Sequence, residues 1–235
     1  MEDIELVHIN ENSIVQQSYK IMDNFIQKST FRDWTLDKID EAFNTKQIWE
    51  MNALDELLAF QYEVNDMESW FLNELQSVYK LGGDDWNEVE LENKFISPLI
   101  VLAKLNDERF SYFLERELQV IIDNYDLSGK VDGMIATGYR NPKKPFFCLK
   151  EYKRQTDPNG DPRGQALIAM IAAQALNDNN GTVYGCYIIG RSWNFMALVE
   201  KEYAISNVYT CTTDELWNIF RILKGLRSII EKKLM

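Results

Sequence analysis

The chain has 235 residues, of which 46% are hydrophobic and 26% charged, and its formal net charge is −12. These values predict a globular protein with a sizeable core, built as one domain with an appendage or as two small domains. A single histidine, His8, argues against Ser-His-Asp or Cys-His catalysis and against a histidine-rich zinc site. The three cysteines are widely spaced and lie in apolar stretches, which favours reduced thiols. With no apolar signal core and no apolar run of membrane-spanning length, we expect a cytoplasmic protein without membrane contact.

Residues 1–85 are expected to form an acidic helical region. Apolar positions recur at helical spacing in residues 14–28, 36–43 and 54–79, and Thr35 is placed to cap the second of these segments. Residues 81–85, Leu-Gly-Gly-Asp-Asp, break the pattern and mark a domain boundary. Residues 1–92 hold 21 Asp and Glu against 6 Lys and Arg, so the acidity of the chain lies here. Such helices could bind a protein partner, shield the rest of the protein or complete its fold.

Residues 86–106 are expected to form the next helix, as the first element of a second domain over residues 86–235. Asn87 is placed to cap it, and Glu88, Glu90 and Glu92 fall in its first turns. Carboxylates at this end complement the helix dipole, which accounts for all three glutamates without any other role. The alternative is that one of them projects toward acidic residues further along the chain. Residues 110–126 then form either an amphipathic segment leading into a strand or a helix that becomes a strand at 118–123.

Residues 130–137 and 145–153 are expected to be the two strands of an antiparallel hairpin, because glycine and proline turn signals fill the link between them. Asp132 near the start of one strand would then lie close to Glu151 near the end of the other. Residues two apart in a strand share a face, so Glu151 and Lys153 point one way and Tyr152 points the other.

Two carboxylates and a lysine on one hairpin face suggest a metal-binding catalytic site. Carboxylate oxygens are hard ligands suited to Mg²⁺ or Mn²⁺, and a neighbouring lysine can position a water that attacks a phosphodiester. Each part has an ordinary interpretation as well. A Glu-x-Lys on a strand is commonly a surface charge pair, and an Asp before Gly is commonly a turn.

The rest of the chain completes an α/β pattern. Residues 164–178 are a strongly apolar helix with Gln165 at its N-terminal end, and residues 182–190 are a strand buried on both faces. Two more strands at 193–200 and 202–209 precede a final helix that Thr213 is placed to cap. The expected fold is a mixed β-sheet flanked by helices.

Positive charge gathers around the hairpin and at the end of the chain. Residues 139–164 carry seven basic residues against three acidic ones, and we expect the basic residues to flank the carboxylate site where phosphates would arrive. The last helix is also basic, which is typical of a solvated face.

The order Asp132, Glu151-Tyr152-Lys153 and Gln165, on strand, strand and helix, resembles the active-site signature of the PD-(D/E)XK nuclease superfamily. The resemblance covers residues from about 88 to about 200, and Val131 stands where the superfamily name puts proline. The string from Glu88 to Pro98 is similar to the start of the nuclease domain in type I restriction motor subunits. The resemblance therefore implies a restriction-endonuclease-like core.

It also implies roles for residues. Asp132, Glu151, the carbonyl of Tyr152 and Glu88 would bind one or two Mg²⁺ or Mn²⁺ ions, with Glu92 in reserve for Glu88. Lys153 would position the attacking water, and Gln165 would orient the lysine, the water or a phosphate.

We therefore expect a metal-dependent nuclease that acts on nucleic acid, with DNA favoured over RNA, and a homodimer is one arrangement that cuts two strands. Two alternatives remain. In one, the fold is a non-catalytic interaction or regulatory module whose acidic N-terminal helices bind a protein partner. In the other, the protein binds nucleic acid without cleaving it.

Overall fold

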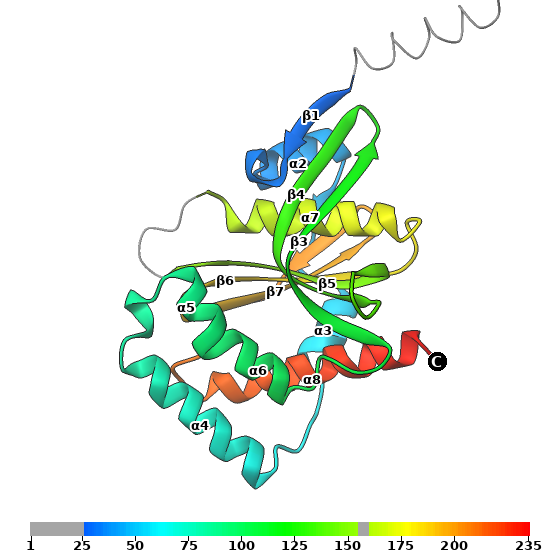
Figure 1. The fold of residues 1–235 in the computed structure, drawn as a ribbon. Helices are drawn as coiled ribbons and strands as arrows, with labels where there is room; N and C mark the ends of the chain where they lie inside the picture. The colour runs from blue at the N-terminus through cyan, green and yellow to red at the C-terminus, as the bar shows by residue number, and fades with distance from the viewer. Residues whose placement is uncertain (1–25, 155–159) are drawn as a thin grey trace, which may run out of the picture.

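The architecture is α/β, as expected from the sequence. A computed structural model describes residues 26–154 and 160–235, and these residues form one mixed sheet of nine strands in the order β1-β4-β5-β6-β7-β8-β2, with β3 paired to β4 and β9 paired to β7. Helices cover both faces of the sheet (Figure 1). Within the described residues, no helix is both long enough and apolar enough to cross a bilayer.

The N-terminal part of the chain is not purely helical, which corrects the expectation for residues 1–85. Strand β1 (Gln27–Thr30) pairs parallel with β4, and β2 (Lys46–Gln47) pairs parallel with β8. Between them lie the 3₁₀ turn η1 (Phe31–Asp33) and α2 (Leu36–Phe43). The predicted helix at 36–43 is confirmed. The one at 14–28 lies largely outside the described residues, and its last two residues belong to β1.

The long amphipathic run predicted at 54–79 is two helices, α3 (Asn52–Leu58) and α4 (Asp66–Lys80). The second begins at a capping box. The Asn65 side chain accepts a hydrogen bond from the Glu68 N–H at 2.9 Å, and the Glu68 carboxylate accepts one from the Asn65 N–H at 3.3 Å. These two bonds satisfy backbone donors at a new helix start, so the apolar periodicity continues across a break in the backbone. The break in the pattern predicted at 81–85 follows the end of α4 and includes the 3₁₀ turn η2 (Gly83–Asp85).

The predicted helix at 86–106 is a continuous helical run made of α5 (Glu88–Leu91), a π-helical turn η3 (Glu92–Ile96) and α6 (Ser97–Leu102). Asn87 caps it as expected, with its side chain accepting from the Glu90 N–H at 2.9 Å. The π-helical turn changes which face the residues after Leu91 present, compared with a regular α-helix.

A long hairpin follows, formed by β3 (Phe110–Ile122) and β4 (Tyr125–Thr137). Residues 110–122 are therefore strand throughout, and the helical alternative for this segment is wrong. Strand β5 (Lys143–Lys153) then pairs antiparallel with the second half of β4, which confirms the predicted hairpin.

The remaining elements match their predictions closely, except that the strand predicted at 202–209 ends at Ile205 and a separate short strand begins at Tyr209. They are α7 (Pro162–Leu176), β6 (Val183–Ile189), β7 (Ser192–Val199), β8 (Glu202–Ile205), β9 (Tyr209–Thr210) and α8 (Glu215–Lys233). Thr213 lies just before α8, where its hydroxyl accepts from the Glu215 N–H at 3.3 Å. Trp193, which follows the β6–β7 turn, is fully buried in the core.

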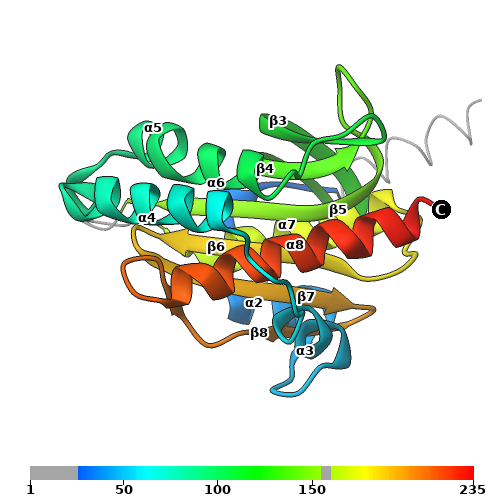
Figure 2. The ribbon, with the colours of Figure 1, turned by 90° about the horizontal axis from the view of Figure 1, so that it is seen from below.

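The core has two layers, one on each face of the sheet. Helix α7 packs on β5 and β6 on one face, with α2 next to it. Helices α4, α6 and α8 cover the other face, where Figure 2 shows α8 running diagonally across the strands. Residues from both the N-terminal and C-terminal parts share each layer, so residues 26–85 do not form a separate core.

A buried ion pair joins α4 to α8. The Lys224 ammonium lies 2.9 Å from the Glu68 carboxylate, and both side chains are almost completely buried. Tyr62 donates a hydrogen bond to the same carboxylate at 2.9 Å, and its ring lies 4.7 Å from the ammonium. This pair accounts for one basic residue of the final helix, for which the sequence had suggested a solvated face.

We predict that Lys224→Met destabilises the protein by about 3–5 kcal/mol, because it leaves the Glu68 carboxylate buried without a cation. The double variant Glu68→Met with Lys224→Met should recover most of that loss, since apolar side chains of similar volume replace both charges. Urea denaturation followed by circular dichroism measures both values. A double variant as unstable as the single one would show that the pair itself stabilises the fold.

Candidate active site

A cleft opens where β4 changes partners along one edge. Strand β1 pairs with β4 at residues 125–128, and β5 pairs with it at residues 133–137, which leaves residues 129–132 of β4 between the two. The cleft there has a volume of about 860 Å³. Its lining includes all the side chains that the sequence singled out apart from Tyr152 and Glu92, namely Glu88, Asp132, Glu151, Lys153 and Gln165.

Asp132 is held at the point where the β4–β5 ladder ends. The last ladder pair is Gly133 with Lys150, and beyond it the Asp132 carboxylate accepts a hydrogen bond from the Tyr152 N–H at 2.9 Å. The Asp132 side chain thereby accepts from the Tyr152 N–H, a donor that lies beyond the last backbone pair of β4 with β5. Burial raises the pKa of Asp132, and the hydrogen bond from Tyr152 and the charge of Lys153 only partly oppose this effect.

Glu151 and Lys153 share the cleft face of β5, as the period of two predicts. The Lys153 Nζ lies 2.6 Å from Glu151 Oε1 and 3.3 Å from the Tyr152 carbonyl oxygen. Glu88 approaches from the start of α5, with its Oε1 3.7 Å from the same Nζ. One ammonium therefore faces three carboxylates, counting Asp132.

Burial and this excess of carboxylates over ammonium groups together shift the pKa values in the cleft. Burial and the neighbouring Asp132 raise the pKa of Glu151 to about 7, despite its contact with Lys153. Burial acts to lower the pKa of Lys153, but Glu151, Asp132 and Glu88 together raise it above its ordinary value. Lys153 is therefore a firmly charged ammonium in a cleft that holds more negative charge than it neutralises.

Gln165 lies at the start of α7 with its side chain only 6% exposed. Its amide lines the cleft and makes no hydrogen bond to any of the described residues. Gly160 allows this placement, because its φ of +80° is in the left-handed region and a Cβ there would lie 2.7 Å from the Gln165 amide nitrogen. The result is a polar group available to something inside the cleft.

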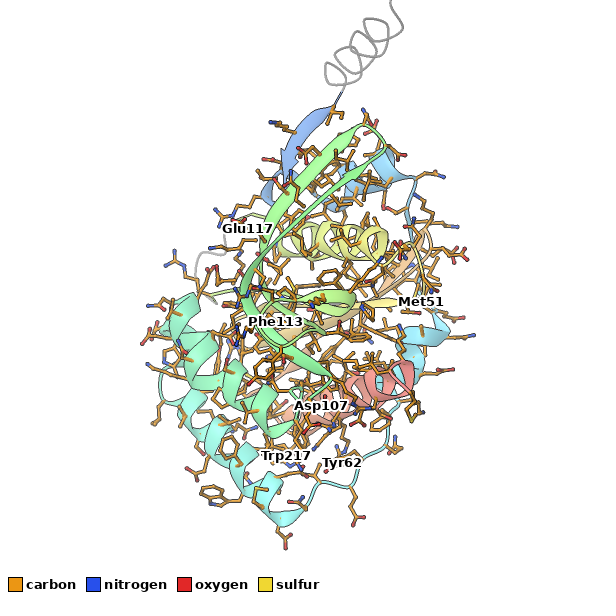
Figure 3. The ribbon with its side chains drawn as sticks, turned by 45° about the vertical axis from the view of Figure 1, so that its right-hand side comes forward. Met51, Tyr62, Asp107, Phe113, Glu117 and Trp217 are labelled. Carbon is orange, nitrogen blue, oxygen red and sulfur yellow. The ribbon has the colours of Figure 1, made fainter. Side chains whose placement is uncertain are left out.

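The opposite wall of the cleft was not foreseen from the sequence. It comes from η1, where the Phe31 ring packs so closely on Gly129 that a Cβ at Gly129 would lie 2.3 Å from the ring. Arg32 lines the cleft next to it and has no ion pair with any described residue. Glu115 and Glu117 on β3 line it as well, and Figure 3 shows Glu117 on the part of the hairpin that extends past Phe113 toward β1. Phe31 and Arg32 reach the site through the pairing of β1 with β4, and Glu115 and Glu117 reach it through the pairing of β3 with β4; no sequence motif marked either pairing.

Glu92 does not join the site, so its role as the reserve for Glu88 is wrong. Its carboxylate lies 3.5 Å from the Lys150 Nζ on the reverse face of β5. Regular α-helical spacing predicted that Glu88 and Glu92 share a face. The start of the helical run instead lies at the C-terminal end of β5, with one glutamate reaching each face of that strand.

The expectation that basic residues flank the site is only partly correct. Lys143 pairs with Thr137 at the far end of the β4–β5 hairpin, ten residues along β5 from Lys153, which is roughly 33 Å of strand. Lys144 forms an ion pair there with Asp178, beyond the C-terminal end of α7. Arg163 is near Gln165, but it pairs with Asp161 at 3.4 Å. Asp157, counted in the same stretch, lies outside the described residues.

The oxygen atoms around Lys153 Nζ that could bind a metal belong to the Glu151 carboxylate and the Tyr152 carbonyl, with the Asp132 and Glu88 carboxylates close by. All are hard oxygens of the kind that Mg²⁺ and Mn²⁺ prefer, and their excess negative charge suits a divalent cation. Across the described residues, no three or more carboxylates, thiols or imidazoles already converge in metal-binding geometry. The donor set fits such an ion provided that Lys153 moves away from Glu151.

We predict that the stability of the protein falls as the pH rises from 5 to 8. Because the pKa of Glu151 is raised from 4.5 to about 7, the folded protein keeps a proton in this window that the unfolded chain has released. Glu151→Gln should remove this loss, which is on the order of 3 kcal/mol at most. Urea denaturation in EDTA at several pH values measures it, with the exposed Glu202→Gln as control. Equal pH slopes in wild type and Glu151→Gln would contradict the raised pKa.

A comparison of the sequence with models of known protein families finds no match, and a comparison with curated proteins finds none either. Any function assigned to the cleft is therefore inferred from its geometry alone.

Proposed function

We propose that the protein is a metal-dependent nuclease that hydrolyses phosphodiester bonds, with DNA as the favoured substrate. The observation that carries this proposal is the convergence of Asp132, Glu151, Lys153 and Gln165, from two strands and a helix, on one cleft. The order of elements is a glutamate-bearing helix, three antiparallel strands, a helix and a strand parallel to the last of the three, and this order also supports a restriction-endonuclease-like core.

The metal would be Mg²⁺ or Mn²⁺, held by Asp132, Glu151, the Tyr152 carbonyl and Glu88. When bound, it supplies Lewis acidity at the phosphate and lowers the pKa of a coordinated water. The protein contributes a rigid pair of ligands, because the Asp132 carboxylate is fixed by the Tyr152 N–H and Glu151 lies next to it in the same sheet.

Lys153 has two roles in this proposal, one toward the attacking water and one toward the phosphate. Its ammonium remains protonated, so it serves to hold the attacking water by hydrogen bonding and to stabilise negative charge on the phosphate, rather than to remove a proton. The Gln165 amide can donate to a phosphate oxygen or orient the water.

The walls of the cleft carry charges of both signs, which affects how it can bind a phosphate. Arg32 and Lys130 lie on its walls, but Glu115 and Glu117 stand there too, and Lys130 is 3.4 Å from Glu115. Phosphate binding therefore depends on the metal more than on a basic surface. A cytoplasmic location and a homodimer stay predictions from the sequence.

We predict that Asp132→Ala, Glu151→Ala and Lys153→Ala each reduce cleavage by at least about a thousandfold, because each removes a group that acts on the reacting atoms. The measurement is cleavage of labelled DNA and RNA in Mg²⁺ or Mn²⁺, beside calorimetric titration of the protein with Mn²⁺. Asp132→Ala should also lose the Mn²⁺ binding of the wild type.

The matched controls are Lys46→Ala and Glu202→Ala, which make the same changes at exposed positions on β2 and β8 at the opposite edge of the sheet. Both should cleave like the wild type. Cleavage that survives in all three cleft variants would remove the nuclease assignment, and salt-sensitive binding without product would favour a nucleic-acid-binding protein.

A second candidate function, an interaction module, is supported by the surface of α4. Met67, Trp70, Val78 and Leu81 are all exposed. Their spacings of three, eight and three residues place them on one face of α4 and its C-cap, and we refer to them as the apolar stripe. Glu74 lies on the same face, and the surrounding segment is acidic. A basic amphipathic helix of a partner protein has the complementary chemistry.

We predict that a fluorescent helical peptide of leucine and lysine binds this stripe, and that Trp70→Lys weakens binding about tenfold or more, since aromatic anchors dominate such interfaces. Fluorescence anisotropy measures the affinity. Trp49→Lys is the matched control, because Trp49 is 89% exposed but lies outside α4. Equal affinity of the two variants would show that the peptide responds only to net charge and would remove support for the module.

A further inference from the structure

A second cluster of charged and polar side chains lies directly behind the cleft, on the reverse face of β5. Glu92 and Lys150 are 4% and 6% exposed, and the atoms of their ion pair are 3.5 Å apart. The Lys150 ammonium also lies 4.5 Å from the Tyr112 ring centroid and 5.5 Å from that of Tyr152. None of the roles assigned above uses Glu92, Lys150 or Tyr112.

The Glu92 carboxylate joins three separate elements. The Ser97 hydroxyl of α6 donates to it at 2.5 Å, and the Tyr112 hydroxyl of β3 donates at 3.2 Å. Lys150 of β5 supplies the third contact at 3.5 Å. One buried carboxylate therefore connects the helical run that begins at Glu88 to β3 and β5, the two strands that flank β4 at Gly133.

The cluster also presses against the cleft strand itself. A Cβ at Gly133 would lie 2.6 Å from the Tyr112 hydroxyl and 2.9 Å from Lys150 Cε, so only glycine admits this approach. Gly133 directly follows Asp132, and it pairs with Lys150, which directly precedes Glu151. The two carboxylates of the cleft are thus each one residue away from a contact of the cluster on the other face of the sheet.

The helix end completes the arrangement. Glu88 and Glu92 are one turn apart, and they contact Lys153 and Lys150, which belong to opposite faces of β5. The helix therefore holds the end of β5 between two glutamates. Any shift of Glu92 relative to Lys150 moves Glu88 relative to Lys153.

We propose that the Glu92–Lys150–Tyr112 cluster is a positioning network that fixes Asp132, Glu151 and Glu88 relative to one another. A buried ion pair is a poor way to stabilise a fold, because apolar residues of similar volume serve at least as well. Groups that orient metal ligands from behind, by contrast, commonly change metal affinity or activity tenfold to a hundredfold when they are lost. The inference rests on the proposed function for its metal readout, but the geometry it describes is independent of any metal.

The test compares two double variants that make the same chemical change at two places. Glu92→Met with Lys150→Met removes the network, and Glu68→Met with Lys224→Met removes the other buried Glu–Lys pair, which also has a tyrosine hydroxyl on its carboxylate. Two quantities are measured in each. One is the hydrogen-exchange rate of the Tyr152 amide, which donates to Asp132. The other is the Mn²⁺ affinity by calorimetry.

We expect the Glu92/Lys150 variant to exchange the Tyr152 amide about tenfold faster or more and to bind Mn²⁺ about tenfold more weakly or more. The Glu68/Lys224 variant should keep both wild-type values at a comparable melting temperature. Wild-type exchange and wild-type Mn²⁺ affinity in the Glu92/Lys150 variant would overturn the proposal, and so would equal changes in both variants.

Two further results keep the outcomes distinct. If the wild type binds no Mn²⁺ and cleaves nothing, the proposed function fails, but the Tyr152 exchange rate still decides whether the network positions Asp132. If the Glu92/Lys150 variant does not fold, Tyr112→Phe takes its place, because it removes one hydroxyl and keeps the ring. Faster Tyr152 exchange in Tyr112→Phe, with an unchanged melting temperature, supports the network, and unchanged exchange rejects it.

Discussion

The hydrogen bond from the Tyr152 N–H to Asp132 is the interaction on which the cleft depends. Antiparallel pairing of β4 with β5 stops at Gly133 and Lys150, and β4 pairs with β1 instead from Ser128 backward. A backbone donor left at such a junction must find an acceptor, because a buried N–H without a partner is costly. The Asp132 carboxylate supplies the acceptor, and in doing so it is carried into the gap between β1 and β5.

The burial that makes the cleft also concentrates charge there. Three carboxylates surround Lys153. Burial raises the pKa values of Asp132 and Glu151, and the charge of Asp132 adds to this effect at Glu151. Such an arrangement lowers the stability of the folded state at neutral pH, and it persists only if the surrounding structure holds it in place. The two core layers do so, since α7 closes one side of β5 and the Glu92 cluster closes the other.

Local sequence rules predicted that Asp132, Glu151 and Lys153 lie together, because their placement depends on local geometry. A period of two put Glu151 and Lys153 on one face, and turn residues set the β4–β5 pairing that brings Asp132 to them. The failures are all at long range or at irregular backbone. Strand β1 and Arg32 reach the cleft through a parallel pairing between residues about a hundred positions apart. The break before Asn65 divides one apolar run between two helices, and the helical run that carries Glu88 and Glu92 includes a π-helical turn. The basic loop at Lys143 was assigned to the wrong end of a hairpin whose length the sequence did not fix.

The two faces of β5 have different environments, one open to the cleft and one buried in the protein. On one face Glu151 and Lys153 meet Asp132 and Glu88, where charge is exposed to a cleft and a ligand can alter it. On the other, Lys150 and Tyr152 meet Glu92 and Tyr112, where the charges are satisfied within the protein and closed to solvent. Alternation along a strand makes this division possible, because successive residues belong to different environments. A substitution at Lys150 is therefore a change to the cleft as well as to the core, since the backbone that holds Lys150 also places Glu151.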